Sequence, residues 1–269
     1  MFKAVFISFF FLIACVSITA QVSKKIIFIT APNNHDKGEH EYKKGCYLLA
    51  DLLNKRMPDL STTVYENGWP SNADAFDSVA ALVLYCNGGE RHLLLSHLQE
   101  MDALMQRGVG LVAIHNAIEA PKGETGNLFL DWLGGYFETW YSVNPRWKAN
   151  VNIVSSHEIS QDIQPFAIKD EWYYHIRFAD SMKNVFPILE AIPPMSSLQE
   201  TDNAYKGNPL VRKAVANKES QVLCWAYNRP NDGRSIGFTG GHYHKNWGNA
   251  YFRKIVLNAI LWVSHIDMP

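Results

Sequence analysis

The sequence predicts an α/β fold with a mainly parallel central sheet and helices on both of its faces. Short runs such as residues 79–86 and 109–114 are apolar throughout, which is typical of strands buried on both faces. These runs alternate with longer segments whose apolar residues recur at helical spacing, as expected for a parallel sheet. No Pro-, Gly- or Ser-rich linker interrupts the chain, so one domain is expected.

The first half of the chain carries the clearest pattern. Strands are expected at residues 25–30, 62–66, 79–86 and 109–114. Helices are expected at 42–57, which Pro58 ends, at 93–107, and at 127–133, which Gly134-Gly135 ends. The predicted order of elements is therefore β-α-β-β-α-β-α.

The second half is less regular. Strands are expected at 149–154, 185–191, 220–227 and 234–239, with the last two paired through the turn-rich loop 228–233. A closing helix is expected at 251–264, where apolar residues share one face. Residues 195–219 are polar and turn-rich, which indicates a surface excursion next to a site.

The N-terminus predicts export. Lys3 precedes an apolar stretch over residues 4–15, and small residues then end at Ala20, as in a secretory signal peptide. We expect residues 1–20 to be removed and residues 21–269 to form the mature domain in the periplasm. In the alternative reading, Cys15 lies in a lipoprotein box and carries a lipid anchor. No apolar run of 18 or more residues follows residue 20, so no transmembrane segment is expected in the mature chain.

Composition excludes one class of protein, and the net charge gives no support to another. Apolar residues make up 47% of the chain and charged residues 19%, which excludes a disordered protein. The formal net charge of −1 gives no support to nucleic-acid binding. Cys46, Cys86 and Cys224 remain after residue 20; their odd number excludes a complete disulfide framework, and we expect them to be small buried side chains.

Polar side chains gather just after the predicted strands. These groups occupy residues 38–41, 87–91, 115–119 and 240–247, which follow the first, third, fourth and last strands. Ligands of open α/β sheets bind at the carboxyl ends of parallel strands. We therefore expect four side chains from distant segments to converge in one cleft, namely His40, His115, Glu171 and His242.

This set of side chains suits two kinds of chemistry. His40, His115 and His242, together with a carboxylate, match the ligands of a divalent ion such as zinc. Without a metal, the same imidazoles would donate hydrogen bonds to sugar hydroxyls and move protons. A purely structural reading stays open, in which His115 is a core imidazole and residues 170–175 form a half-buried strand.

The remaining candidates are residues that would contact a substrate. Aromatic rings with polar tips suit a saccharide, because they offer an apolar face and a hydrogen-bonding edge. Besides His40, the candidates are Glu119, Trp172, Tyr173, His175, His244 and Trp247. His242 and His244 are two residues apart, so in extended backbone they would face the same side.

Together these motifs resemble the ThuA-like (trehalose utilisation) family of the class I glutamine amidotransferase-like superfamily. The resemblance extends over residues 24–266. It is clearest at 108–115, 129–137, 170–173, 240–247 and 258–262. It implies a flavodoxin-like α/β fold, in agreement with the periodicity.

The resemblance also implies what the chain does and does not carry. Amidotransferases hold a nucleophilic cysteine on the turn after a central strand, where this chain has His115, and Cys86 ends a different strand without an evident His–Glu relay. The favoured hypothesis is an exported enzyme, a hydrolase, lyase or isomerase acting on a saccharide or keto-sugar, with His115, His242 and Glu171 as catalytic residues. The alternatives are a non-catalytic sugar-binding protein and a Cys86-dependent hydrolase.

Overall fold

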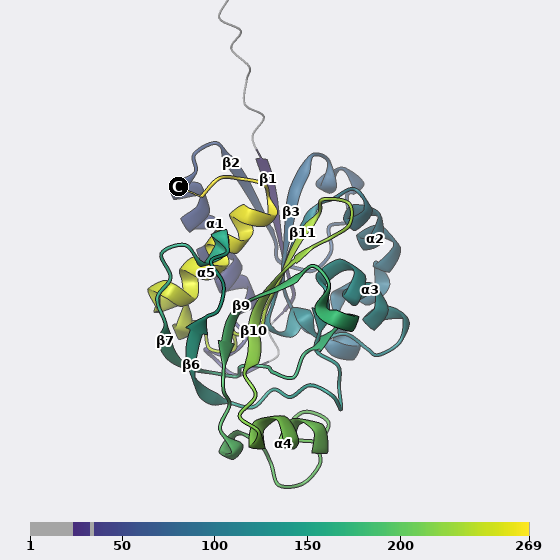
Figure 1. Cartoon of the computed structure of the whole chain (residues 1–269). Helices are drawn as coiled ribbons and strands as arrows, with labels where there is room; N and C mark the ends of the chain where they lie inside the picture. Colours follow the sequence, from purple (N-terminus) through teal and green to yellow (C-terminus); the bar gives the residue numbers. More distant parts are fainter. Residues whose placement is uncertain (1–23, 33–34, 269) are drawn as a thin grey trace, which may run out of the picture.

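A sheet of nine strands forms the centre of the protein, with helices packed on both of its faces (Figure 1). The computed structural model describes residues 24–32 and 35–268. The predicted signal peptide, its cleavage site after Ala20 and the alternative lipidation site Cys15 lie outside the described residues.

Five neighbouring strands of the sheet are parallel. The strands of the whole sheet are β1 (Lys24–Thr30), β2 (Leu60–Tyr65), β3 (Val79–Tyr85), β4 (Gly110–Ile114), β6 (Trp147–Ile153), β7 (Phe166–Asp170), β9 (Val185–Ala191), β10 (Gln221–Asn228) and β11 (Arg234–Phe238). They lie in the order β2-β1-β3-β4-β11-β10-β9-β6-β7, and the pairs from β2 to β11 are parallel. This part has the flavodoxin-like order, and β3 and β4 lie inside it, which confirms the predicted fold class.

The other half of the sheet is an antiparallel extension. β10 and β11 form the predicted pair, with Cys224 opposite Phe238 and Asn228 opposite Arg234. β9, β6 and β7 continue the sheet, each antiparallel to its neighbour. β7 was not expected as a strand; its side chains alternate between half-buried and exposed up to the buried Asp170, as expected for an edge strand with one face towards solvent. Its end carries Asp170 towards the end of β11, which matters for the site below.

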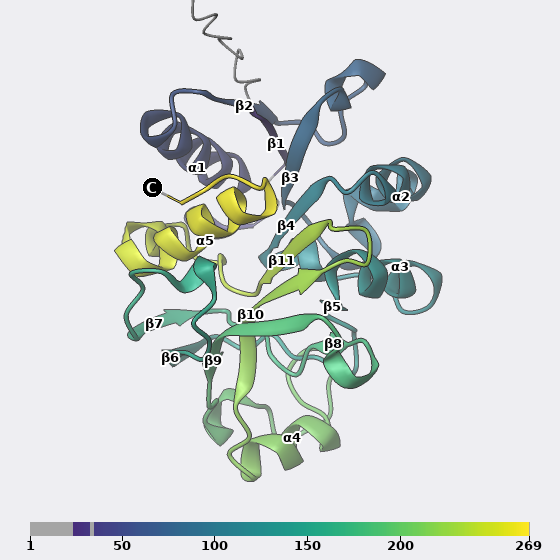
Figure 2. The same cartoon turned by 45° about the horizontal axis from the view of Figure 1, so that its top comes forward.

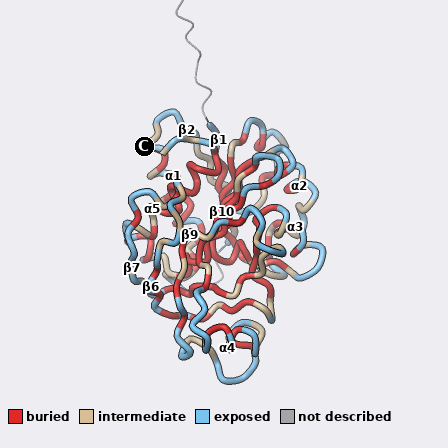
Figure 3. Tube along the Cα trace, in the orientation of Figure 1, coloured by how far each residue is buried: buried red, intermediate tan, exposed pale blue. Residues whose placement is uncertain are grey.

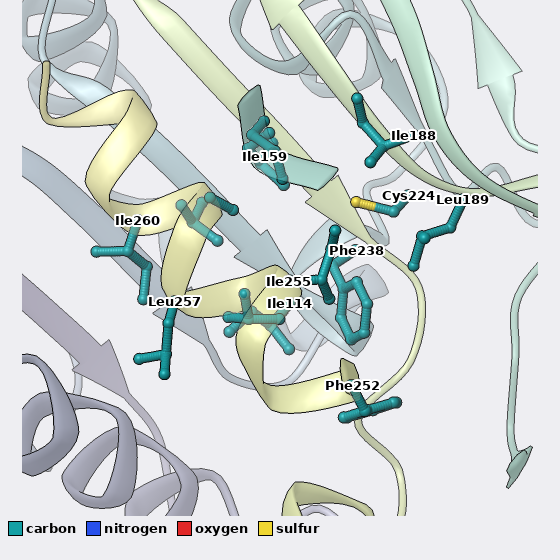
Figure 4. Close-up of a cluster of buried hydrophobic side chains, with 14 of the residues drawn as sticks. Ile114, Ile159, Ile188, Leu189, Cys224, Phe238, Phe252, Ile255, Leu257 and Ile260 are labelled. Carbon is teal, nitrogen blue, oxygen red and sulfur yellow. The ribbon is translucent and has the colours of Figure 1, made fainter. Parts of the chain in front are cut away.

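Helices cover both faces of the sheet, as predicted. The helices are α1 (Tyr42–Arg56), α2 (Leu98–Gln106), α3 (Glu124–Leu133), α4 (Pro209–Ala216) and α5 (Ala250–Val263). Figure 2 shows α1 and α5 on one face and α2 and α3 on the other. Each face has its own buried apolar cluster, and the central strands are buried throughout (Figure 3). Figure 4 shows Ile255 of α5 beside Ile114 and Phe238 of the sheet.

Two segments differ from the sequence prediction. The helix expected at 93–107 is a 3-10 turn at Leu93–Ser96 followed by α2, because the His92 side chain accepts a hydrogen bond from Leu94 N and caps the shorter turn. The excursion at 195–219 contains α4. Asn208 caps this helix by accepting from Val211 N, and Pro209 occupies its first turn, a start signal that the sequence does carry.

The cysteines are buried and unpaired. Cys46, Cys86 and Cys224 are free thiols inside the core, as expected. None of the helices in the described part of the chain is both long and apolar enough to cross a membrane.

A buried histidine makes the fold sensitive to acid. His92 is 3% exposed; its Nε2 donates to Ala117 O at 3.1 Å, and its Nδ1 accepts from Leu94 N. Burial lowers its pKa from 6.5 to about 4, so in this pH window the unfolded chain binds a proton that the folded chain does not. His92 therefore stabilises the fold fully above pH 6.5, and about 3 kcal/mol of that stability is lost as the pH falls to 4.

Urea denaturation at several pH values tests this expectation. Between pH 6.5 and 4, we expect the free energy of unfolding of His92→Gln to fall less steeply than that of the wild type. The difference in slope corresponds to the uptake of up to one proton per molecule on unfolding. Between pH 7 and 8 both proteins should show the same slope, which serves as the control. Identical slopes of the two proteins below pH 6.5 would contradict the assignment.

Candidate active site

Four side chains from distant segments meet at one end of the sheet. They are His40, His115, Glu171 and His242, all buried, and one nitrogen or oxygen atom of each lies within 4.8 Å of the others. His40 Nε2 is 3.1 Å from His115 Nε2 and 2.7 Å from His242 Nδ1. Glu171 Oε2 lies 4.0, 3.5 and 3.3 Å from the same three nitrogens. The four side chains predicted from the strand ends therefore lie together.

The fold positions each histidine just beyond a parallel strand. His115 directly follows β4, and its φ of 55° turns the chain sharply at that point. His40 follows β1 with φ 47°, and its N–H donates to His242 O at 2.8 Å, which ties the first loop to the loop after β11. Left-handed backbone is unfavourable for residues other than glycine, and such positions concentrate at functional sites.

Asp170 holds the loop after β11 against the end of β7. Its Oδ1 accepts from Glu171 N at 2.8 Å and from His242 N at 3.0 Å. Its Oδ2 accepts from Gly241 N at 2.9 Å and from Asn246 Nδ2 at 3.0 Å. Asp170 is fully buried, so these four donors replace its hydration. It is a positioning residue, because it fixes the backbone of two members of the cluster.

The surroundings aim the lone pairs of the cluster inward. His115 Nδ1 lies 2.8 Å from Thr239 O, and a carbonyl only accepts, so Nδ1 carries the proton and Nε2 presents its lone pair. His242 Nε2 lies 3.2 Å from Glu39 Oε2; the pair lacks hydrogen-bond geometry, but the nearby carboxylate attracts a proton to that side of the ring. Such outer carboxylate and carbonyl contacts are typical of metal-binding histidines.

Glu171 divides its two oxygens between the cluster and two cations. Its Oε1 lies 3.5 Å from Lys206 Nζ and 3.9 Å from Arg146 Nε, whereas Oε2 faces the histidines. Burial disfavours the carboxylate, but the contacts with His115 and His242 outweigh burial and hold the pKa of Glu171 below its usual range. Burial and the two neighbouring imidazoles lower the pKa of His40, so it is neutral. Three imidazoles around a carboxylate form the donor set that a divalent cation prefers.

The separations within the cluster fit a zinc-like ion. A tetrahedral ion with bonds of about 2.0–2.1 Å has ligand atoms about 3.3 Å apart. The observed separations are 2.7 to 4.0 Å for the five pairs given above, and the whole set lies within 4.8 Å, so small shifts of the side chains would bring the four atoms to that value. Three histidines and one carboxylate also match the ligand types of zinc sites.

An open cavity of about 420 Å³ adjoins the cluster. This volume lies in the range of about 300–1,000 Å³ that is typical of small-molecule sites. Of the residues expected to take part, the walls include His40, Glu119, Glu171, Tyr173 and His242. His115 is buried behind them with its Nε2 in the cluster.

Glu119 and Tyr173 place further polar groups beside the cluster. Tyr173 Oη lies 3.3 Å from His115 Nε2 and also donates to Asn116 Oδ1. Burial raises the pKa of Glu119 to about 7, although its contact with Tyr173 acts in the opposite direction. Gly88 lets the neighbouring turn close on this wall, since a Cβ there would lie 2.1 Å from Asn116 O. A carboxyl group poised near neutral pH is a good proton donor or acceptor.

Four expected contact residues lie outside the cavity, which corrects their predicted place. Trp172 is fully buried against Phe238, and Trp247 packs at 1% exposure in the same core, so neither ring can face a sugar. His175 bonds to Tyr141 O through Nδ1. The backbone enters a 3-10 turn at His244, so the extended geometry that would have put His242 and His244 on one side is lost.

Sequence reasoning missed the wall formed by the second half of the chain. Asn144, Arg146, Tyr205 and Lys206 line the cavity and come from irregular loops. Asp170 lies inside a motif that the sequence singled out, but its role as an acceptor for four donors was not recognised. Residue pattern carries no signal for the loop positions, because only tertiary packing brings them to the site.

Cys86 has the wrong surroundings for a nucleophile. It is fully buried at the end of β3 and is not among the cavity-lining residues. Burial raises the pKa of its thiol, which disfavours the reactive thiolate. The geometry gives no support to a Cys-dependent reaction.

Comparisons with known proteins agree with this fold. A putative ThuA-like protein from Bacteroides uniformis ATCC 8492 is similar, with 14% identity over 90% of this chain and 91% of that chain and a TM-score of 0.62. One from Parabacteroides merdae ATCC 43184 has 13% identity, coverages of 91% and 92%, and a TM-score of 0.60. No curated protein matches the chain. The family model ThuA, described as trehalose utilisation, matches residues 29–263, so the chain belongs to the ThuA family.

Proposed function

We propose that this protein is an enzyme acting on a saccharide, and that it holds a divalent cation such as zinc. The single observation that carries the proposal is the convergence of His40, His115, Glu171 and His242. Family membership indicates a role in carbohydrate metabolism. The cavity is small and polar, and its size suits a sugar.

The reaction that best suits these groups is proton transfer on a carbonyl-bearing sugar, by a lyase or isomerase, with hydrolysis of a glycosidic bond as the related alternative. A bound cation would supply Lewis acidity towards a carbonyl or hydroxyl oxygen of the sugar. Glu119 would give a proton from beside the cluster, because its raised pKa keeps much of it protonated at neutral pH. Asn116, Tyr173 and Lys206 would bind hydroxyl groups and orient the ring.

Metal analysis together with turnover tests the proposal. The protein is produced without a His tag, and its metal is measured by elemental analysis. Trehalose, methyl α-glucoside and their 3-keto derivatives are then offered, with products followed by NMR. We expect about one metal per chain and turnover that is lost with a chelator and restored by zinc or manganese. Binding without turnover of any probe would instead support a sugar-binding protein. Full turnover by the metal-free protein would show that the reaction needs no metal.

The Glu119 carboxyl group predicts how turnover depends on pH. If protonated Glu119 donates the proton, turnover should fall about tenfold per pH unit above pH 7. Glu119→Gln should lower turnover by about 100-fold or more and remove this dependence, while leaving the metal content unchanged. The charged or titratable groups around Glu119 are Arg91, Glu171, Tyr173 and Lys206. Two results would contradict proton donation by Glu119: wild-type turnover that rises through pH 7, or a Glu119→Gln variant with the same pH profile of turnover as the wild type.

We also propose that the protein is exported. The charged start, the apolar stretch and the small residues up to Ala20 support this, as they form a signal-peptide pattern. N-terminal sequencing and mass spectrometry of the mature protein test it. A start at Gln21 is expected, and a lipid on Cys15 would identify a lipoprotein instead.

A further inference from the structure

We propose that the site extends beyond the cavity to a second sugar ring, which stacks on a platform formed by Trp140 and Tyr205. These two residues would then select glycosides of two rings over single sugars, and a neutral outer ring over an acidic one. This inference rests on the proposed function, since it assigns the substrate of the same site.

Trp140 is an unusual surface residue. It is 63% exposed, more than any other large apolar side chain in the described part of the chain. Its φ of 69° is strongly disfavoured for a bulky residue. The backbone is held there by the bond from Trp140 N to Ala204 O at 2.9 Å. The exposed ring of Trp140 does not contribute to the packing of the core, although its backbone is held in a strained conformation. This combination points to a ligand that the ring contacts.

Tyr205 joins the platform to the cavity. Tyr205, next to Ala204, lines the cavity and is 39% exposed; its ring stacks on Phe137 with centroids 6.0 Å apart and an angle of 17°. Asn144 N donates to Tyr205 O at 2.9 Å, which joins residues 140–144 to residues 203–206 along one wall.

The inner end of this wall reaches the cluster. Lys206 Nζ donates to Asn144 O at 2.8 Å and lies 3.5 Å from Glu171 Oε1. One short wall therefore leads from the candidate catalytic group Glu171, past Tyr205, to the segment that carries Trp140. A ring bound at the cluster would direct its neighbour towards Tyr205 and the segment that carries Trp140.

The chemistry of the wall favours a neutral ring. A pyranose has an apolar C–H face and polar edges, and Tyr and Trp offer a rigid apolar surface with a polar tip at low entropic cost. The cations nearest the wall are already paired, since Arg146 contacts Glu39 and Glu171, and Lys206 contacts Glu171. An acidic outer ring would have to compete with these carboxylates.

Binding of one-ring and two-ring probes tests the inference. Calorimetry with the metal-loaded protein compares methyl α-glucoside with trehalose, each also as its 3-keto derivative, and turnover is measured alongside. We expect the two-ring probes to bind more tightly. Trp140→Ala should weaken them about tenfold, or about 1.4 kcal/mol, and leave the one-ring probes unchanged. Trp140→Phe should retain most of the affinity, and Tyr205→Ala should also weaken the two-ring probes.

Phe186→Ala is the matched control, because Phe186 is an aromatic residue of β9 with 41% exposure and lies outside this wall. It should bind all probes as the wild type does. If Trp140→Ala weakens one-ring and two-ring probes alike, or neither, the platform is wrong while the saccharide function stands. If no probe of either kind binds the wild type, the proposed function fails and the platform fails with it.

Discussion

Replacing His115 is expected to remove bound metal and turnover together. His115 is fully buried, and its Nε2 is one of four converging ligand atoms, so no neighbouring side chain can take its place. Loss of an outer partner of a metal ligand typically costs 10–100-fold in affinity, so loss of a ligand should cost about 100-fold or more. Elemental analysis and a competition titration with a zinc indicator measure the metal, and turnover is followed on the same samples.

The choice of substitution matters because His115 has φ 55°. Asn tolerates left-handed backbone better than Ala, so His115→Asn separates loss of the ligand from backbone strain. His115→Ala and His115→Asn should both lose metal, and His115→Asn should keep more of the wild-type stability to urea. His97→Ala is the control, since His97 is a partly exposed histidine paired with Glu100 away from the cluster, and it should retain metal. Full metal content in both His115 variants would overturn the metal site.

The strand-end rule explains why the cluster could be predicted from the sequence. The apolar runs that became β3 and β4 are buried on both faces, so their pattern fixes a parallel sheet and the edge at which its loops meet. His40, His115 and His242 each follow a parallel strand of that sheet, and the rule needs no further information to bring them together.

Alternation of side chains explains which aromatic predictions failed. In the segment after β7, Glu171 and Tyr173 line the cavity, whereas Trp172 and Tyr174 are fully buried in the core. Successive residues of extended backbone face opposite sides, so one stretch cannot supply both Trp172 and Tyr173 to the same ligand. The expectation that Trp172 and Tyr173 both contact a substrate ignored this period of two.

The loop residues could not have been predicted in this way. Arg146 and Lys206 reach Glu171 from segments with no regular pattern, and their approach depends on how residues 140–144 pack against 203–206. Periodicity describes which face of an element is buried, but it carries no information on contacts between two irregular loops.

Asp170→Asn is expected to destabilise the fold and weaken metal binding, although the residue is no ligand. Each oxygen of Asp170 accepts from two N–H donors, so an amide group in either orientation turns its NH₂ towards two of them. A buried donor left without an acceptor costs about 1–3 kcal/mol, and we expect a loss of about 2–4 kcal/mol in total. Because Asp170 fixes the backbone at Glu171 and His242, zinc affinity should also fall about 10–100-fold.

Urea denaturation of the chelated protein measures the first effect without any contribution from metal, and a zinc titration of the folded variant measures the second. Asp162→Asn is the matched control, because Asp162 is an exposed residue that pairs with Lys254 at 2.9 Å. An exposed ion pair contributes about 0–1 kcal/mol, so this variant should keep both its stability and its zinc affinity. If Asp170→Asn weakens zinc binding no more than Asp162→Asn does, Asp170 acts only in folding, and the loop after β11 does not need it to hold His242 and Glu171 in place.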